Sequence, residues 1–339
     1  MSDHAQVVDD DDPLPLSALK HRLSEKTYQW LEAAEFPTED DEGLHFVGFS
    51  LSSANDDEDE EQWTRVQDWC SSASTPDGVG GYYNQEELGA PKDGGIKVQY
   101  ILSSASGGHG DDLWAASRHV ANLLADKDQC RKLLGASQTE GHPLAGRSFL
   151  ELGAGGGVPS WTAQWCGARV VVCTDQSIPD RIRCLAECAE RNGRRIQQQQ
   201  LPKQKETARV APYDWGSSID EVVSFLTPEE NSKTMDNNRS LFDVIVAADC
   251  IYMPELHTKL IDSLRRLLHP QRGVALLPFA LHGNTDDTRV WTIIETAQEF
   301  GFKVENLGSV QLTPQADGMD AKRALVHMLR LTVQQQQRS

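Results

Sequence analysis

The sequence predicts an α/β fold in three layers, with helices covering both faces of a mostly parallel β-sheet. From residue 111 to residue 333, strand-like apolar runs alternate with helix-like segments, which is typical of a parallel sheet. The last two strand-like runs follow each other without a helix, so we expect an antiparallel strand at one edge. A glycine-rich turn after the first run indicates a ligand site at the carboxyl ends of the strands.

Composition divides the 339 residues into four parts. We expect residues 1–15 to be a disordered acidic tail, residues 16–110 an N-terminal appendage, residues 111–333 the main domain and residues 334–339 a frayed glutamine-rich end. The pattern of the appendage is less regular than that of the main domain. We therefore expect the appendage to accompany the main domain and not to be an enzyme by itself.

Three segments of the appendage carry local structural signals. Ser17 is a candidate N-cap for a helix that continues to Ala34. The runs 44–51 and 96–102 predict strands, and the acidic run 56–61 predicts a solvated loop.

The elements of the main domain follow in order along the chain. We expect strands at 148–152, 168–173, 242–248, 273–280, 303–307 and 324–333. Asp111 or Asp112 is a candidate cap for a first helix that contains Trp114. Further helices are expected at 158–166, 180–191, 255–268 and 286–300. Asn192 and Gly193 should end the helix at 180–191, and the polar segments 197–206 and 227–240 should be surface loops.

Charge and composition limit the partners of the chain. A net charge of −19 repels nucleic-acid phosphates, so DNA and RNA are disfavoured as substrates, whereas a basic protein is compatible. Alternatively, the acidic excess sits in tails and only aids solubility. No apolar run is long enough to cross a membrane, and the N-terminus lacks a signal-peptide pattern. We expect a monomer in the cytoplasm or the nucleus, without a membrane partner.

The cysteines and histidines give no metal-binding pattern. The seven cysteines include no C-x-x-C pair, which favours reduced core thiols over disulfides. His109, His119 and His142 are scattered without ligand spacing. We therefore expect no metal site.

The glycine-rich turn has the features of a nucleoside-binding loop. Gly153, Gly155 and Gly157 follow a strand and precede a helix, and glycine lets the backbone turn tightly and approach a ligand. Asp175 ends the next strand about twenty residues later, where an acid can accept hydrogen bonds from both ribose hydroxyls. The alternative is that Asp175 only caps the next helix. Glu151, just before the loop, is a candidate for binding a methionine amino group.

The spacing of the glycines separates possible cofactors. A nicotinamide dinucleotide fingerprint is G-x-G-x-x-G, whereas this chain has G-x-G-x-G followed by Val158. No Lys-Ser/Thr pair of a P-loop follows either. The pattern therefore favours S-adenosylmethionine over a dinucleotide or ATP.

Four segments make the chain resemble the seven-β-strand methyltransferases. They are Leu113-Trp114, Glu151-Leu-Gly-Ala-Gly155, Tyr213-Asp-Trp-Gly216 and Ala248-Asp-Cys-Ile-Tyr252. Within that class, the chain is similar to the protein-lysine methyltransferases that include enzymes acting on elongation factors and chaperones. Some fungal members of this branch were first labelled nicotinamide N-methyltransferase-like. The resemblance covers roughly 111–333 and implies a Rossmann-like sheet of seven strands.

The resemblance also implies roles for individual residues. Trp114 would lie against the methionine end of S-adenosylmethionine, and Trp215 would pack beside the adenine. Ala248 would touch the cofactor at the end of a strand. The backbone of the loop would wrap the cofactor through Gly153, Ala154 and Gly155, with Asp175 on the ribose.

Asp249 and Tyr252 are the candidate acceptor-site residues. Asp249 follows an apolar strand at the same sheet edge as the glycine loop, where a carboxylate can orient an amine. Tyr252 can hydrogen-bond a lysine or offer a π face to its cationic form. Alternatively, Asp249 caps a helix that begins near Met253-Pro254, and Trp215 is an ordinary core residue.

Some segments point to a different member of the branch. Fungal members of the nicotinamide-labelled group tend to have Phe-Asn after the motif acid, where this chain has Tyr252. In contrast, Leu277-Pro-Phe-Ala-Leu-His-Gly283 and Arg323-Ala-Leu-Val-His327 look more like that group. The sequence therefore predicts a methyltransferase for protein lysines, for example of an elongation factor. The alternatives are a small-molecule N-methyltransferase, such as one acting on nicotinamide, and a binding module that has lost catalysis.

Overall fold

The computed structural model describes ten segments of the chain, namely residues 13–35, 67–70, 81–82, 96–102, 113–137, 140–198, 208–226, 241–281, 287–312 and 324–334, with the backbone alone at 67–70 and 81–82. The expected strand at 44–51, the acidic run at 56–61, the loop at 227–240 and the end of the chain from residue 335 lie outside these residues.

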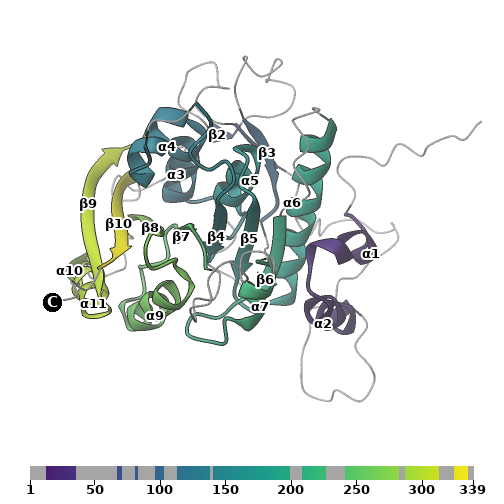
Figure 1. Cartoon of the computed structure of the whole chain (residues 1–339). Coiled ribbons are helices and arrows are strands. Elements are labelled where there is room, and N and C mark those ends of the chain that lie inside the picture. The colour runs from purple at the N-terminus through teal and green to yellow at the C-terminus, as the bar shows by residue number, and fades with distance from the viewer. Residues whose placement is uncertain are drawn as a thin grey trace, which may run out of the picture.

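A seven-stranded sheet forms the centre of the molecule, in the order β6-β5-β4-β7-β8-β10-β9 (Figure 1). The strands are β4 (Ser148–Leu152), β5 (Val170–Asp175), β6 (Ala208–Pro212), β7 (Val244–Val246), β8 (Val274–Ala280), β9 (Phe302–Gln311) and β10 (Leu325–Val333). Strands β4 to β8 pair in parallel. Strand β10 pairs antiparallel with β8 and with the edge strand β9. The mixed sheet, with antiparallel pairing at one edge, is as predicted.

Two hydrophobic clusters on opposite faces of the sheet confirm the three layers. Successive residues of β4 belong to different clusters, Phe149 to one and Leu150 to the other, as the two-residue period of a strand requires. The first cluster includes residues of α3 (Ala115–Ala125), α4 (Lys127–Leu134), α5 (Val158–Trp165) and α6 (Pro179–Gln198). The second includes residues of α7 (Asp220–Ser224), α9 (His257–Leu267), α10 (Asp287–Val290) and α11 (Ile293–Glu299).

Helix α6 does not end at Asn192 and Gly193, so that prediction was wrong. The buried Asn192 side chain accepts a hydrogen bond from Gln99 N–H at 2.9 Å and donates one to Gln99 O at 2.7 Å. A Cβ at Gly193 would lie 2.2 Å from a guanidinium nitrogen of Arg22. The pair thus joins the N-terminal segments to α6, and these tertiary contacts override the local preference of Asn-Gly for a helix end.

The described N-terminal segments pack against the main domain. A small sheet has the order β2-β1-β3, with strands β1 (Gln67–Cys70), β2 (Gly81–Tyr82) and β3 (Lys97–Tyr100). Apolar residues at both ends of this part of the chain, such as Leu19 and Val98, belong to the same cluster as α6. The expected helix from Ser17 to Ala34 is instead three pieces, α1 (Leu16–Leu19), η1 (Lys20–Arg22) and α2 (Glu25–Glu35).

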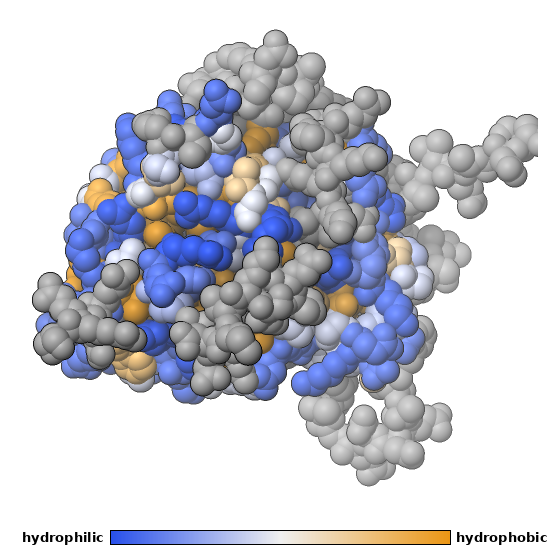
Figure 2. Space-filling view, in the orientation of Figure 1, coloured by the Kyte–Doolittle hydropathy of each residue, from blue (hydrophilic) through white to orange (hydrophobic). Residues whose placement is uncertain are grey.

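Helix boundaries differ from the predictions for local reasons. Ser17 caps nothing, because α1 begins after Pro15, whereas Ser24 Oγ accepts from Thr27 N–H at 3.1 Å at the start of α2. The N-cap of α3 is Trp114, and the predicted caps Asp111 and Asp112 lie outside the described residues. A short η3 (Pro254–Leu256) precedes α9. No helix among the described segments is both long and apolar enough to cross a bilayer, and Figure 2 shows hydrophilic side chains over much of the visible face.

Candidate functional site

The turn between β4 and α5 has the backbone of a ligand-binding loop. Gly153, Gly155 and Gly157 have φ angles of 64°, 54° and 69°, in the left-handed region that favours glycine. A Cβ at Gly153 would lie 2.7 Å from Sγ of Cys250 and 3.4 Å from the ring of Trp215. A Cβ at Gly155 would meet nothing within 4 Å. The loop is therefore packed tightly at Gly153 and open at Gly155.

Asp175 links this loop to the end of β5. The residue is only 4% exposed, and Oδ2 accepts a hydrogen bond from Gly155 N–H at 2.7 Å. Oδ1 accepts from Gln176 N–H at 2.7 Å and from Arg181 Nη1 at 3.1 Å. The acid thus lies beside the open part of the loop, as predicted from the spacing. It binds loop atoms and a guanidinium, which a simple helix cap would not.

Glu151 lies beneath the loop and is almost fully buried. Its Oε2 accepts hydrogen bonds from the N–H of Ser160, at 2.9 Å, and from the Ser160 hydroxyl, which fixes the start of α5 to the end of β4. Burial raises the pKa of Glu151 to about 8, although the bonds from Ser160 favour the ionised form. The carboxyl therefore has a structural partner, and its contact with a methionine amino group stays a prediction.

The Tyr213-Asp-Trp-Gly216 segment follows β6 and is held by side-chain hydrogen bonds. The Tyr213 hydroxyl and the N–H of Gly216 both donate to Ser263 Oγ in α9, each at 2.9 Å. Asp214 accepts a hydrogen bond from the Ser177 hydroxyl at 2.7 Å. These anchors hold the half-buried Trp215 ring against Gly153. Trp215 is thus at a strand end beside the loop, as expected, and is not an ordinary core residue.

Asp249 occupies a strained and buried position after β7. Its φ is 51°, the one left-handed angle of a non-glycine residue among the described residues. Oδ1 accepts from Ala280 N–H at 2.7 Å, and Oδ2 accepts from Ala116 N–H at 3.4 Å. Burial raises the pKa of Asp249 to about 7. Because η3 has no side-chain cap, Asp249 does not cap that helix. It joins the end of β8 to the start of α3.

The remaining predicted residues surround Asp249 and Asp175. Ala248 directly precedes Asp249 and is partly buried, although β7 ends earlier than predicted, at Val246. Trp114 is half-buried at the N-cap of α3, two residues before Ala116. Burial raises the pKa of the Tyr252 hydroxyl, with smaller effects of Cys250, Arg181 and Asp175. The structure therefore brings the predicted donor and acceptor residues to one edge of the sheet.

Several residues at this edge were not predicted. Arg181, in the first turn of α6, forms an ion pair with Asp175. His257 Nε2 lies 2.8 Å from Ile251 O, next to Tyr252. A Cβ at Gly156 would lie 3.0 Å from Tyr100 and 3.2 Å from Leu102, so the end of β3 and the residues after it pack against the loop at Gly156. Arg181 could have been predicted, because it is a basic residue six positions after Asp175. The contact with β3 could not, because it depends on tertiary structure.

The described residues contain no group of three His, Cys, Asp or Glu side chains that could hold a metal ion. The site instead brings together the glycine loop, the Asp175 carboxyl, the Trp215 ring and the buried Asp249 carboxyl at one edge of the sheet. This set can bind a nucleoside cofactor and position a second reactant beside it.

Comparison with known proteins gives matches over the same region. A family model described as lysine methyltransferase matches residues 97–286. The protein N-terminal and lysine N-methyltransferase efm7 of Schizosaccharomyces pombe is 30% identical over 242 residues, 70% of this chain and 82% of that protein. The protein of the same name from Aspergillus fumigatus is 28% identical over 59% of this chain and 67% of its own length. A Streptococcus mutans structure described as a SAM-dependent methyltransferase is 15% identical and covers 75% of this chain and 58% of that chain, with a TM-score of 0.44.

Proposed function

The chain belongs to the lysine methyltransferase family and is an S-adenosylmethionine-dependent enzyme, and from this premise we propose that its acceptor is a lysine of a cytoplasmic protein such as a translation elongation factor. The single observation that carries the proposal is the shared sheet edge of the glycine loop and the Asp249–Tyr252 box. The proposed donor residues and the proposed acceptor residues share this edge.

The residues of the donor site fit the cofactor. Glycine at position 155 leaves open space where a side chain would project, and the adjacent Asp175 carboxylate is fixed by the loop itself. The ribose hydroxyls would bind Asp175, and the adenine would pack on Trp215. The methionine end would lie near Trp114, Glu151 and Ala248, with Gly153, Ala154 and Gly155 around it. When bound, S-adenosylmethionine supplies an electrophilic methyl group.

The acceptor site must present a neutral amine in line with that methyl group. A free lysine has a pKa of about 10.4, so the site has to favour loss of its proton, which partial burial does. The Asp249 carboxylate is held in a fixed orientation by Ala280 and Ala116. Asp249 and the Tyr252 hydroxyl would orient the nitrogen, and the proton would leave to water. Neither side chain needs to act as an obligatory base.

The protein α-amino group is a second candidate acceptor. The relatives are named for both N-terminal and lysine methylation. An α-amino group has a pKa of about 8, so it is deprotonated more readily than lysine at neutral pH. The same Asp249 and Tyr252 would orient it. We further propose that the enzyme acts as a monomer in the cytoplasm, with the nucleus as a second location.

Mass spectrometry of the proteome from cells with and without the gene tests the proposed function. Loss of a lysine methyl mark from one abundant protein is the expected result, and loss of an N-terminal mark would identify the second acceptor. Purified enzyme with radiolabelled S-adenosylmethionine should label a protein band in extract from the deleted strain. Label only in small molecules, such as nicotinamide, would overturn the proposal.

A further inference from the structure

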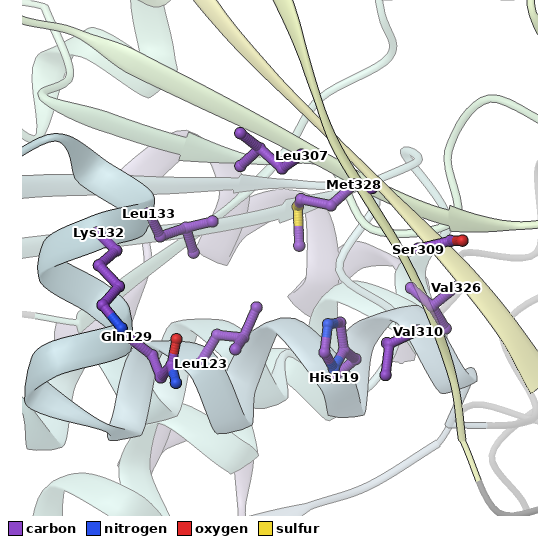
Figure 3. A pocket seen from close by; sticks show the side chains of 11 residues that line it. His119, Leu123, Gln129, Lys132, Leu133, Leu307, Ser309, Val310, Val326 and Met328 are labelled. Atoms are coloured by element: carbon purple, nitrogen blue, oxygen red, sulfur yellow. The ribbon is translucent and has the colours of Figure 1, made fainter.

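A groove of about 300 Å³ lies between α3 and α4 on one side and strands β9 and β10 on the other (Figure 3). Its lining is mixed. The apolar side chains are Leu123, Leu133, Leu307, Val310, Val326 and Met328, and the polar ones are His119, Gln129, Lys132 and Ser309. Leu307 is 42% exposed and Val310 is 36% exposed, and they are the exposed large apolar residues among the described part of the chain. Apolar side chains that stay accessible in a concave surface are typical of a binding site for another molecule.

A β-bulge directs both of these side chains into the groove. Residues three apart on a regular strand point to opposite faces. Here Asn306 pairs with Leu329 and Ser309 with His327, so β9 has one extra residue, and Gly308 has a φ of 95°. The extra residue restores Leu307 and Val310 to the same face of the sheet. Bulges of this kind redirect side chains beside functional sites.

The charge of the groove is opposite to that of the whole chain. Lys132 is the one charged side chain in its lining, and no acidic residue is among the lining residues of the described chain. Burial lowers the pKa of His119, which favours its neutral form. In a protein with a net charge of −19, this groove is therefore suited to an occupant with apolar side chains and a carboxylate near Lys132.

The groove extends to the first turn of α3, which contacts Asp249. Val326 lines the groove and also packs against Ala115 and Ala116. The N–H of Ala116 donates to Asp249. His119 lies three residues further along α3, which corresponds to about 4.5 Å of helix. The end of the groove that Val326 lines is therefore close to Asp249, in the proposed acceptor site.

We propose that this groove binds an extended segment of the methyl-acceptor protein, through two apolar side chains and one acidic side chain. The proposal rests on the proposed function, since it assumes a protein acceptor. An extended chain covers about 3.3 Å per residue. The methylated lysine should then lie within a few residues of the apolar side chains that fill the groove.

The test compares variants of the full-length enzyme on protein extract from the deleted strain, with radiolabelled S-adenosylmethionine as the probe. Leu307→Gln combined with Val310→Thr removes the apolar contacts, with Gln311→Thr on the same strand as control. Lys132→Glu reverses the groove charge, and Lys26→Glu makes the same change on the exposed face of α2. Calorimetry with S-adenosylmethionine shows that each variant is folded and binds the donor.

The double variant should lower the initial rate at low extract concentration roughly tenfold. Lys132→Glu should lower it about fivefold, with a smaller effect at high salt. All variants should approach the wild-type rate at high extract concentration, and both controls should match the wild type throughout. Equal rates for groove variants and controls would overturn the groove proposal while leaving the proposed function intact.

Two other outcomes would also be decisive. No protein labelling by the wild type would overturn the proposed function, and the groove proposal with it. A wild-type dimer in analytical ultracentrifugation that dissociates in the double variant would make a second copy of the chain the occupant, which contradicts the proposal.

Discussion

The proposed donor and acceptor halves of the site are built in different ways. In the donor half, Asp175 bonds a residue 20 positions away and Glu151 bonds a residue 9 positions away. In the acceptor half, Asp249 bonds residues that are 31 and 133 positions away in the chain. The glycine loop with Glu151 and Asp175 is therefore a nearly continuous βαβ unit, which Trp114 and Trp215 complete from other parts of the chain. The hydrogen bonds of Asp249, in contrast, form only when distant segments have docked.

Each half contains one buried carboxyl group with a raised pKa. The largest expected effect is on how the free energy of unfolding depends on pH. For Glu151 the pKa rises from 4.5 to about 8, and for Asp249 it rises from 3.8 to about 7. The folded protein thus retains protons that the unfolded chain has released. Each group's contribution to stability is fully present below about pH 4 and is lost as pH rises to about 8 for Glu151 and about 7 for Asp249.

The free energy of unfolding of the wild type should therefore fall between pH 5 and pH 8. The contribution of each carboxyl is on the order of 4 kcal/mol. The amides in Glu151→Gln and Asp249→Asn do not ionise between pH 5 and pH 8. In each variant the free energy of unfolding should therefore fall less steeply with pH. For Asp249→Asn this difference from the wild type should be complete at a lower pH than for Glu151→Gln. Urea unfolding at several pH values measures this, and parallel profiles for wild type and variants would contradict it.

The next largest effect concerns the donor half alone. Asp175→Ala removes the acceptor of the Gly155 N–H and the proposed ribose ligand. We expect the dissociation constant for S-adenosylmethionine to rise about a hundredfold, since hydrogen bonds to a charged group are lost. Calorimetry measures the dissociation constant, with Asp262→Asn in α9 as a control that should bind normally, because Asp262 is half-buried and pairs with Arg266. Affinity within threefold of the wild type would exclude Asp175 from the donor site.

A change in the acceptor half should lower kcat and leave the affinity for S-adenosylmethionine nearly unchanged. In Asp249→Asn, the new amide NH₂ faces the N–H group of Ala280 or Ala116, so two donors meet and the acceptor pocket loosens. We expect kcat to fall about thirtyfold, while affinity for S-adenosylmethionine changes less than threefold. A similar loss of donor affinity would mean that the two halves are not separable.

The smallest expected effect is on donor binding by glycine variants. It distinguishes the cost of close packing at Gly153 from the cost of backbone strain. Gly153→Ala places a Cβ 2.7 Å from Cys250 Sγ, whereas Gly146→Ala, at a φ of 77°, meets nothing within 4 Å. Both variants carry the left-handed strain of about 1 kcal/mol. Only Gly153→Ala should weaken donor binding, by about tenfold, and Gly153→Ala with Cys250→Ala should partly restore it. Equal affinities for the two single variants would exclude the packing explanation.

The same difference between the halves explains what the sequence could predict. The glycine loop and Asp175 form a local pattern, so their positions followed from spacing alone. The roles of Asn192 and Gly193 were misjudged because Arg22 and Gln99 contact them from the N-terminal segments. Strand β6 was expected only as part of a seven-strand total, because its short run Ala208–Pro212 gives little periodicity.

The residues of the proposed acceptor half were predicted, but the hydrogen bonds that hold Asp249 were not. The Ala248–Tyr252 box placed Asp249 at the correct sheet edge. Its bonds to Ala280 and Ala116 have no sequence signal, since they depend on how β8 and α3 pack. For the same reason, the groove could not be predicted, because it requires the bulge at Gly308 and the docking of α3 and α4.

The most direct test of protein-lysine methylation is acid hydrolysis of protein labelled by the pure enzyme with radiolabelled S-adenosylmethionine in extract from the deleted strain. Wild-type enzyme should give N-methylated lysine in the hydrolysate, and Asp249→Asn should give far less while still binding the donor. Label confined to small molecules, or found on no lysine or N-terminal amine, would contradict the assignment.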